Sequence, residues 1–223
     1  MLNIKDAKSI SNNFNCILSI NCQSYNQSHQ KIKSLINQLR LPQIILLQEM
    51  WQPKISSNIA NYHPPVEFLR KNTQGGGVAT YIRQDINYQE CKEINTIVTI
   101  SIEKVAVITE NSKKCIVIDI YRPPKPNYAE SQIELEKILE AATKTGIPFT
   151  LIGDLNVDLL MDNYIARKYI DLLQTYNCIQ TVIHPTTISA YKNPSSTTVY
   201  VVMILFLILT SLKTKLLTVN QYF

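Results

Sequence analysis

The chain has 223 residues, of which 45% are hydrophobic, so its length and composition favour a single globular domain with one sizeable core. The formal net charge of +5 at pH 7 favours an anionic partner such as nucleic acid but is too small to establish one. The five cysteines form no C-x-x-C pair and the polar N-terminus has no apolar leader segment, which argues against a zinc site and for an intracellular, non-secreted protein with reduced thiols.

Apolar patterns predict strands and helices along the chain, with no linker or internal repeat between them. The predicted strands, in chain order, are residues 16–21, 43–49, a glycine hinge and strand at 75–82, then 96–102, 104–109, 114–121 and 149–153. The predicted helices are residues 29–39, 128–143 and 165–176. Strands predominate with helices between some of them, so we expect two packed sheets flanked by helices.

The end of the chain differs in composition from the rest. Residues 199–209 read VYVVMILFLIL, and no charged residue occurs between Lys192 and Lys213. A membrane-spanning helix needs about 20 apolar residues, so this shorter run favours a core strand or a displaced tail over a membrane anchor. We therefore expect a polar extension over residues 1–14, one domain over residues 15–200 and a divergent apolar tail over residues 201–223.

Several predicted strands end in a polar side chain. Asn21, Glu49, Tyr121 and Asp154 each close an apolar segment, and Asn156 follows Asp154 by two positions. Taken singly, each has an ordinary explanation as a turn cap, a surface residue, a partly buried phenol or a helix start. Strand ends on one edge of a sheet converge, so together these residues predict one shared site.

The residue types at these strand ends favour a divalent cation and a phosphate. Glu49 follows a buried strand and is costly to bury without a cationic partner. Mg²⁺ is usually held by one or two carboxylates together with a substrate phosphate. Asp154 and Asn156 in an extended segment would point to the same side. The carboxylate would then take or orient a water proton while the amide holds the phosphate or that water.

Six segments, in order, resemble the endonuclease/exonuclease/phosphatase superfamily, and more narrowly the apurinic-type endonuclease domain of non-LTR retrotransposons. They are SINCQS (19–24), LLQEMW (46–51), GGGVATYI (75–82), IDIYRPP (118–124), LIGDLNVDLL (151–160) and HPTTIS (184–189). The resemblance implies a four-layered α/β sandwich of two mixed sheets that hydrolyses phosphodiesters in DNA with Mg²⁺, or with Mn²⁺ in its place. DNA is the implied partner and the nucleus the implied location. No stable protein partner and no membrane association are expected.

The resemblance also implies roles for individual residues. Glu49 would hold the metal, and Asp154 would contribute to the metal site and activate the attacking water. Asn21 would contact metal-bound water or phosphate. Tyr121 would donate its hydroxyl to the scissile phosphate, and Asn156 would orient that phosphate.

Two further residues are candidates for substrate binding. Gln23 stands where repair enzymes of the superfamily often have Asp, a substitution found in the retrotransposon branch. Arg122 directly follows Tyr121 and would reach a backbone phosphate. A solvated surface arginine is an equally good interpretation of Arg122.

The C-terminal motifs of the superfamily are missing. SSTTVYVVM (195–203) begins the serine-rich block, but Tyr200 stands near the position where an Asp is expected, and the residues after it include no His and no acid. The final strand with its Asp-His pair is therefore expected to be absent, as a frameshift or premature end in a decaying element would explain. His184 is expected to be an ordinary loop residue.

This loss leaves alternatives open for the function. A positioned acid-base group contributes about 10²–10⁴ in rate, so an endonuclease without the Asp-His pair is expected to be impaired. The alternatives are a catalytically inactive retrotransposon remnant, and a phosphatase or phospholipase of the same superfamily, because a fold does not fix a substrate.

Overall fold

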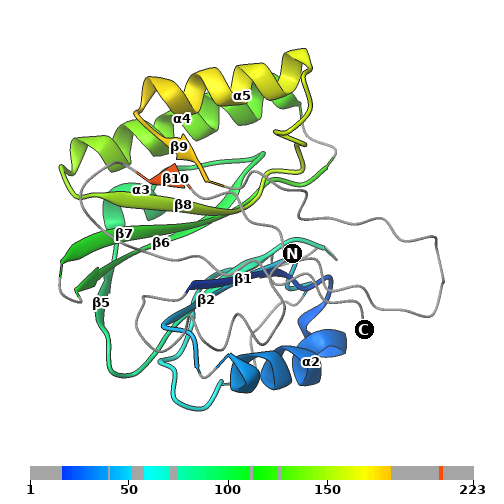
Figure 1. Cartoon of the computed structure of the whole chain (residues 1–223), viewed down its shortest axis with the longest axis vertical. Coiled ribbons are helices and arrows are strands. Elements are labelled where there is room, and N and C mark those ends of the chain that lie inside the picture. Colours follow the sequence, from blue (N-terminus) through cyan, green and yellow to red (C-terminus); the bar gives the residue numbers. More distant parts are fainter. Residues whose placement is uncertain are drawn as a thin grey trace.

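The computed structural model describes residues 17–39, 41–51, 58–70, 75–110, 113–124, 127–181 and 206–207. Within them, two mixed sheets pack face to face and helices cover both outer faces, giving four layers (Figure 1). The expected α/β sandwich is confirmed. The predicted extension at residues 1–14 and most of the predicted tail lie outside the described residues.

The first sheet has four strands. In spatial order they are β1 (Ile17–Asn21), β2 (Ile44–Gln48), β4 (Val78–Ile82) and β3 (Val66–Phe68). β1 and β2 are parallel, whereas β2 and β3 each run antiparallel to β4. Helix α2 (Tyr25–Gln38) covers the outer face of this sheet, because its buried Ile32, Leu35 and Ile36 share an apolar cluster with that face.

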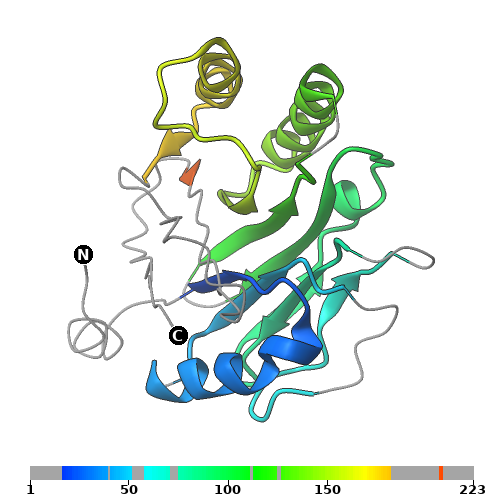
Figure 2. The ribbon, with the colours of Figure 1, turned by 90° about the vertical axis from the view of Figure 1, so that its right-hand side faces the viewer.

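The second sheet has six strands. In spatial order they are β5 (Asn87–Glu90), β6 (Glu103–Glu110), β7 (Lys114–Tyr121), β8 (Phe149–Asp154), β10 (Phe206–Leu207) and β9 (Ile179–Gln180). β7 and β8 are parallel and the other neighbours are antiparallel. The outer face is covered by the short α3 (Lys92–Asn95) and by α4 (Tyr128–Lys144) and α5 (Tyr164–Thr175), which lie side by side (Figure 2).

Side-chain alternation along the strands separates the apolar residues into three layers. On β1, Leu18 and Ile20 belong to the cluster under α2, whereas Ile17 belongs to the cluster between the sheets. On β7, Ile118 packs with the outer helices and Val117 with the first sheet. Every second residue of these strands therefore faces the interface between the sheets.

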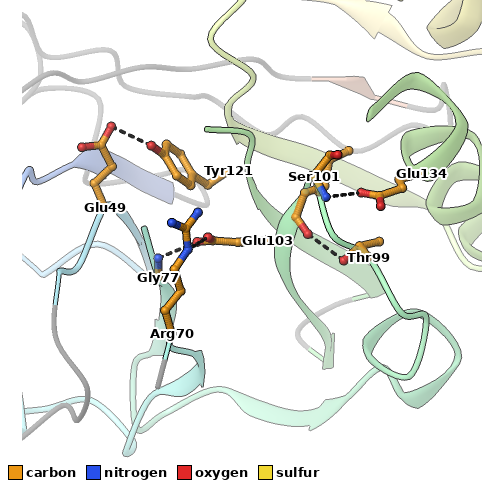
Figure 3. Close-up of polar contacts among 9 residues, drawn as sticks. Glu49, Arg70, Gly77, Thr99, Ser101, Glu103, Tyr121 and Glu134 are labelled. Atoms are coloured by element: carbon orange, nitrogen blue, oxygen red, sulfur yellow. Dashed lines mark hydrogen bonds and ion pairs between the residues drawn. The ribbon is translucent and has the colours of Figure 1, made fainter. Parts of the chain in front are cut away.

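The strand predicted at residues 96–102 is wrong. The segment forms an irregular loop in which Val98 and Ile100 are 86% and 82% exposed. The backbone N–H groups of Ile100 and Ser101 donate to the Glu134 carboxylate on α4, at 2.7 and 2.9 Å. Figure 3 shows the bond from Ser101. These donors are satisfied by a side chain rather than by a neighbouring strand, and this tertiary contact overrides the local β-propensity.

Part of the apolar tail joins the second sheet. Phe206 and Leu207 form β10 and pair antiparallel with Leu151 and Thr150 of β8 and with β9. Two residues of the tail thus lie between β8 and β9. Within the ranges that the structure describes, no helix is long and apolar enough to cross a bilayer.

A polar cluster lies buried between the two sheets. Asp119 of β7 is fully buried and accepts hydrogen bonds from Gln48 Nε2 at 2.5 Å and Thr80 Oγ1 at 3.5 Å. Gln48 Nε2 also donates to Ser19 Oγ at 3.1 Å. Burial raises the pKa of the Asp119 carboxyl well above its ordinary value, and the hydrogen bonds from Gln48 and Thr80 oppose that rise. The cluster therefore ties the sheets together through a carboxyl group that favours its neutral form.

We predict that Asp119→Asn changes the pH dependence of stability. A raised folded-state pKa contributes stability at low pH that is lost as the pH climbs from about 4 towards that pKa. The free energy of unfolding of the wild type should therefore fall relative to that of Asp119→Asn, by up to about 1.4 kcal/mol per pH unit in this window. Urea denaturation of both proteins between pH 4 and 8 measures the difference. A difference that does not vary with pH contradicts the prediction.

Candidate active site

Four strand ends meet at one edge of the sandwich. The parallel pairs β1–β2 and β7–β8 have their carboxyl ends there, with Asn21 opposite Gln48 and Tyr121 opposite Asp154. Glu49 directly follows β2, and its backbone turns there with a φ of 54°. The structure thus brings Asn21, Glu49, Tyr121 and Asp154 to the same edge, as their positions at strand ends predicted.

Hydrogen bonds join these four side chains directly. The Asn21 Nδ2 group donates to Glu49 Oε1 at 2.8 Å and to Asp154 Oδ2 at 3.0 Å. The Tyr121 hydroxyl donates to Glu49 Oε1 at 3.1 Å (Figure 3). One amide therefore bridges two carboxylates that come from different sheets, and the phenol lies beside them.

Asn156 reaches the site by a turn and not by strand alternation. β8 ends at Asp154, and Asn156 has a φ of 49°, outside the extended region. Its backbone N–H donates to Asp154 Oδ1 at 2.7 Å, and its side-chain Nδ2 donates to the Arg122 carbonyl at 2.7 Å. The expectation that Asp154 and Asn156 lie on one side of a continuing strand is therefore wrong, although both residues lie at the site.

Arg122 holds the loop that carries Asn156. Its side chain is fully buried, which rules out a solvated surface arginine. The guanidinium donates to the Leu155 carbonyl at 2.5 Å and to the Asn156 carbonyl at 2.8 Å, and it lies 4.5 Å from the centre of the Tyr128 ring. Contact with a backbone phosphate stays a prediction, and it would require the guanidinium to leave these carbonyls.

Gln23 contributes through its backbone. It has a φ of 42°, and its N–H donates to Asn21 Oδ1 at 3.3 Å. This bond leaves the Nδ2 group of Asn21 turned towards the two carboxylates. A role for the Gln23 side chain in substrate binding stays a prediction.

Gly153 sets the spacing of the two strands that carry Tyr121 and Asp154. It has a φ of +146° and pairs with Ile120 across β7 and β8. A Cβ atom at this position would lie 1.8 Å from the Ile120 carbonyl oxygen. Only glycine allows the two backbones to approach so closely, one residue before the site.

The electrostatics of the site follow from burial and from the nearness of the two acids. Burial raises the pKa of Asp154, and the charge of Glu49 adds to the rise, while hydrogen bonds from Asn156 and Asn21 and the charge of Arg122 oppose it. Burial and the neighbouring Glu49 carboxylate likewise raise the pKa of Tyr121. Two crowded carboxylates and a protonated phenol favour a cation and an anionic substrate between them.

The donor set fits a hard divalent cation with few protein ligands. Among the described residues, no group of three or more His, Cys, Asp or Glu side chains could hold a metal ion. Glu49 and Asp154 supply two carboxylates, which is the number that Mg²⁺ commonly takes alongside waters and substrate oxygens. These residues would hold the metal, while Asn21 keeps the two acids together.

Two residues beside this site were not predicted from the sequence. Glu103 lies opposite Tyr121 in the register of β6 and β7 and is 4% exposed. Its carboxylate accepts a hydrogen bond from the Gly77 N–H at 2.5 Å and forms an ion pair with Arg70 (Figure 3). The only local signal in the sequence is a glutamate at the start of the apolar segment EKVAVIT. It does not indicate that Arg70 is the partner of Glu103.

The two histidines in the described part of the chain, His29 and His63, make contacts with other residues than the four that meet at the site. His184 and Tyr200 lie outside the described residues. His29 Nδ1 bonds to the Asn26 carbonyl at 2.9 Å, and the His63 ring packs against Tyr88. The absence of the C-terminal Asp and Asp-His motifs stays a prediction from the sequence.

The site thus consists of two carboxylates, an amide and a phenol at one edge of a two-sheet α/β sandwich. The profile of the Endonuclease/Exonuclease/phosphatase family matches residues 18–199, and the chain belongs to this family. No curated protein matches the sequence.

Solved structures share the fold at low sequence identity. The endonuclease domain of TRAS1, a telomere-specific non-LTR retrotransposon, has a TM-score of 0.64 and 13% identity, over 85% of this chain and 82% of that one. The 3′ phosphatase NExo from Neisseria, bound to a product DNA hairpin, has a TM-score of 0.56 and 15% identity, over 86% and 85%. A family protein from Leptotrichia buccalis has a TM-score of 0.55 and 16% identity, over 86% and 87%.

We predict that Arg122→Ala lowers the free energy of unfolding by about 2–4 kcal/mol, because it leaves two buried carbonyls without a donor. Arg122→Lys should lose less, since an ammonium keeps the charge but cannot match the planar fork. Urea denaturation measures both changes. Arg167→Ala is the control, because its ion pair with Asp162 is exposed and its removal should change nothing measurable. Equal stabilities for Arg122→Ala and Arg167→Ala would show that the hydrogen bonds from Arg122 do not stabilise the loop of Leu155 and Asn156.

Proposed function

We propose that this chain is a DNA endonuclease of the non-LTR retrotransposon type that cleaves a phosphodiester with Mg²⁺ or Mn²⁺. The observation that carries the proposal is the Asn21 amide bridging Glu49 and Asp154 at 2.8 and 3.0 Å, with the Tyr121 hydroxyl beside them. Membership of the family and the likeness of the fold to the TRAS1 endonuclease domain support it. DNA as the substrate is supported by the NExo structure, which contains a product DNA hairpin.

Each residue has a distinct part in the proposed reaction. Glu49 and Asp154 would hold a divalent cation, which would supply charge stabilisation for the phosphate. Asp154, which the Asn156 N–H and the Asn21 amide hold in place, accepts the proton of the attacking water. Tyr121 stays protonated because its pKa is raised, so it donates a hydrogen bond to a phosphate oxygen.

Asn21 and Asn156 position the reacting groups. Asn21 donates to both acids in the free protein, and its Nδ2 group would contact the phosphate when substrate binds. Asn156 fixes Asp154 through its backbone N–H at 2.7 Å and orients the phosphate with its amide. This pre-organisation reduces the rearrangement needed when the substrate binds.

The proposed activity is weak. The sequence after Tyr200 has neither an acid nor a histidine to stabilise the scissile phosphate. Such partners act as a unit, so their joint loss costs no more than about 10²–10⁴ in rate and leaves the metal-binding half of the site.

We predict that plasmid nicking requires the metal and the bridged acids. Supercoiled plasmid should be converted slowly to the open circle with Mg²⁺ and not in EDTA. Glu49→Gln and Asp154→Asn should lower the rate at least about 100-fold, and Tyr121→Phe about 10- to 100-fold. Glu140→Gln on α4 is the matched control, because Glu140 is half exposed and pairs with Lys144 away from the site. It should nick at the wild-type rate.

The same assay separates the alternatives. Nicking that persists in Glu49→Gln and Asp154→Asn comes from a contaminant or from another site. Failure of the wild type to nick, with correct folding, identifies an inactive remnant. Release of phosphate from a DNA 3′ end, without nicking, identifies a phosphatase, the activity named for the Neisseria protein of similar fold.

A further inference from the structure

An ion pair beside the site has no part in the proposed reaction. Arg70 and Glu103 meet where β6 begins, one strand away from Tyr121. The Arg70 side chain is 31% exposed, whereas that of Glu103 is 5% exposed. Figure 3 shows the outer nitrogens of the guanidinium turned to the side of Glu49 and Tyr121. Glu103 thus anchors a cation that solvent can reach at the rim of the site.

Consecutive glycines make room for this pair. Gly76 has a φ of +70°, and a Cβ atom there would lie 2.5 Å from both Arg70 Nε and Glu103 Oε1. No other residue fits at this position without moving the ion pair. The glycine segment is in turn fixed to the residues after Glu49, because Trp51 N–H donates to the Gly76 carbonyl at 2.9 Å.

Trp51 presents an aromatic ring near the same glycine segment. The residue is 43% exposed, two residues after Glu49, in a backbone with a φ of 53°. A Cβ atom on Gly75 would lie 4.0 Å from Trp51 Nε1, while a Cβ atom on Gly76 would lie 2.5 Å from Arg70 Nε. An exposed indole and a partly exposed guanidinium therefore each lie close to one of two neighbouring glycines.

We propose that Arg70 and Trp51 form a nucleotide-binding subsite beside the scissile phosphate, in which Arg70 binds the phosphate of a flanking nucleotide and Trp51 stacks on its base. This inference rests on the proposed action on DNA. A guanidinium held at Nε by a carboxylate keeps its outer donors for a second anion, which suits bidentate binding of phosphate. Aromatic rings stack on bases of any sequence, so the subsite gives position and affinity without base specificity.

Binding measured without cleavage tests the subsite. Fluorescence anisotropy with labelled DNA in EDTA gives the dissociation constant at several salt concentrations. Arg70→Gln should weaken binding about 3- to 10-fold at low salt and reduce the slope of log K against log salt by about 0.7–0.9, the value for one lost phosphate contact. Trp51→Ala should weaken binding to a similar degree and leave the slope unchanged.

Arg83→Gln is the matched control. Arg83 follows β4 at the end opposite to Gly77, its side chain is 26% exposed, and it forms an ion pair with Asp85. The same charge is removed from a similar environment, so its salt slope should equal that of the wild type. Equal slopes for Arg70→Gln and Arg83→Gln would overturn the phosphate contact.

The single tryptophan of the chain gives a second readout. DNA should quench the intrinsic fluorescence of the wild type and of Arg83→Gln, because the base covers the indole. DNA that binds without changing this fluorescence overturns the stacking. If Arg70→Gln does not fold, Arg70→Lys takes its place. The flanking phosphate of the DNA is then replaced by a neutral methylphosphonate. This replacement should weaken DNA binding by the wild type more than DNA binding by Arg70→Lys. An equal loss in both proteins overturns the contact.

The nicking assay on the same proteins separates this inference from the proposed function. If the wild type nicks plasmid but Arg70→Gln has the wild-type salt slope, the proposed endonuclease activity stands and the proposed subsite is overturned. If Arg70→Gln reduces the salt slope of DNA binding but the wild type never nicks plasmid, the subsite stands and the proposed endonuclease activity is overturned.

Discussion

The site depends on the two hydrogen bonds from the Asn21 amide, because they join an acid that follows a strand of the first sheet to an acid at the end of a strand of the second. Neither sheet could form the site alone. The amide has two N–H groups, and each carboxylate takes one of them, so the separation of the acids is set by a single planar group. The relative position of the two sheets therefore determines the distance between Glu49 Oε1 and Asp154 Oδ2.

That placement rests on strand register. On each of four strands, every second residue faces the interface between the sheets, and these residues include Asn21, Gln48, Asp119 and Asp154. A shift of one residue in the register would turn any of these side chains to the opposite face. The cluster of Gln48, Thr80 and Asp119 lies one layer below the site and is fully buried. A hydrogen-bonded cluster of this kind is satisfied in one arrangement only, so it opposes slippage where apolar contacts alone would tolerate it.

The sequence predicts the fold and the convergence of the strand ends because both depend on short-range patterns. Short, nearly continuous apolar runs predict the central strands, and the polar residues that close several of these runs predict the site. The strand predicted at residues 96–102 fails because Glu134, distant in sequence, binds the backbone of that segment. The sequence also did not predict the turn at Asn156 or the ion pair of Arg70 with Glu103. A left-handed turn and an ion pair between distant residues leave no periodic signal in the sequence.

The forces that hold the fold and those that would perform chemistry act on different residues. Three apolar clusters contain the stabilising burial, and they include Tyr121 but neither Glu49 nor Asp154. The charge of Glu49 adds to the effect of burial and raises the pKa of Asp154, so ionisation of Asp154 is harder in the free protein. A cation that binds these acids in the folded chain would relieve that repulsion and stabilise the fold by mass action.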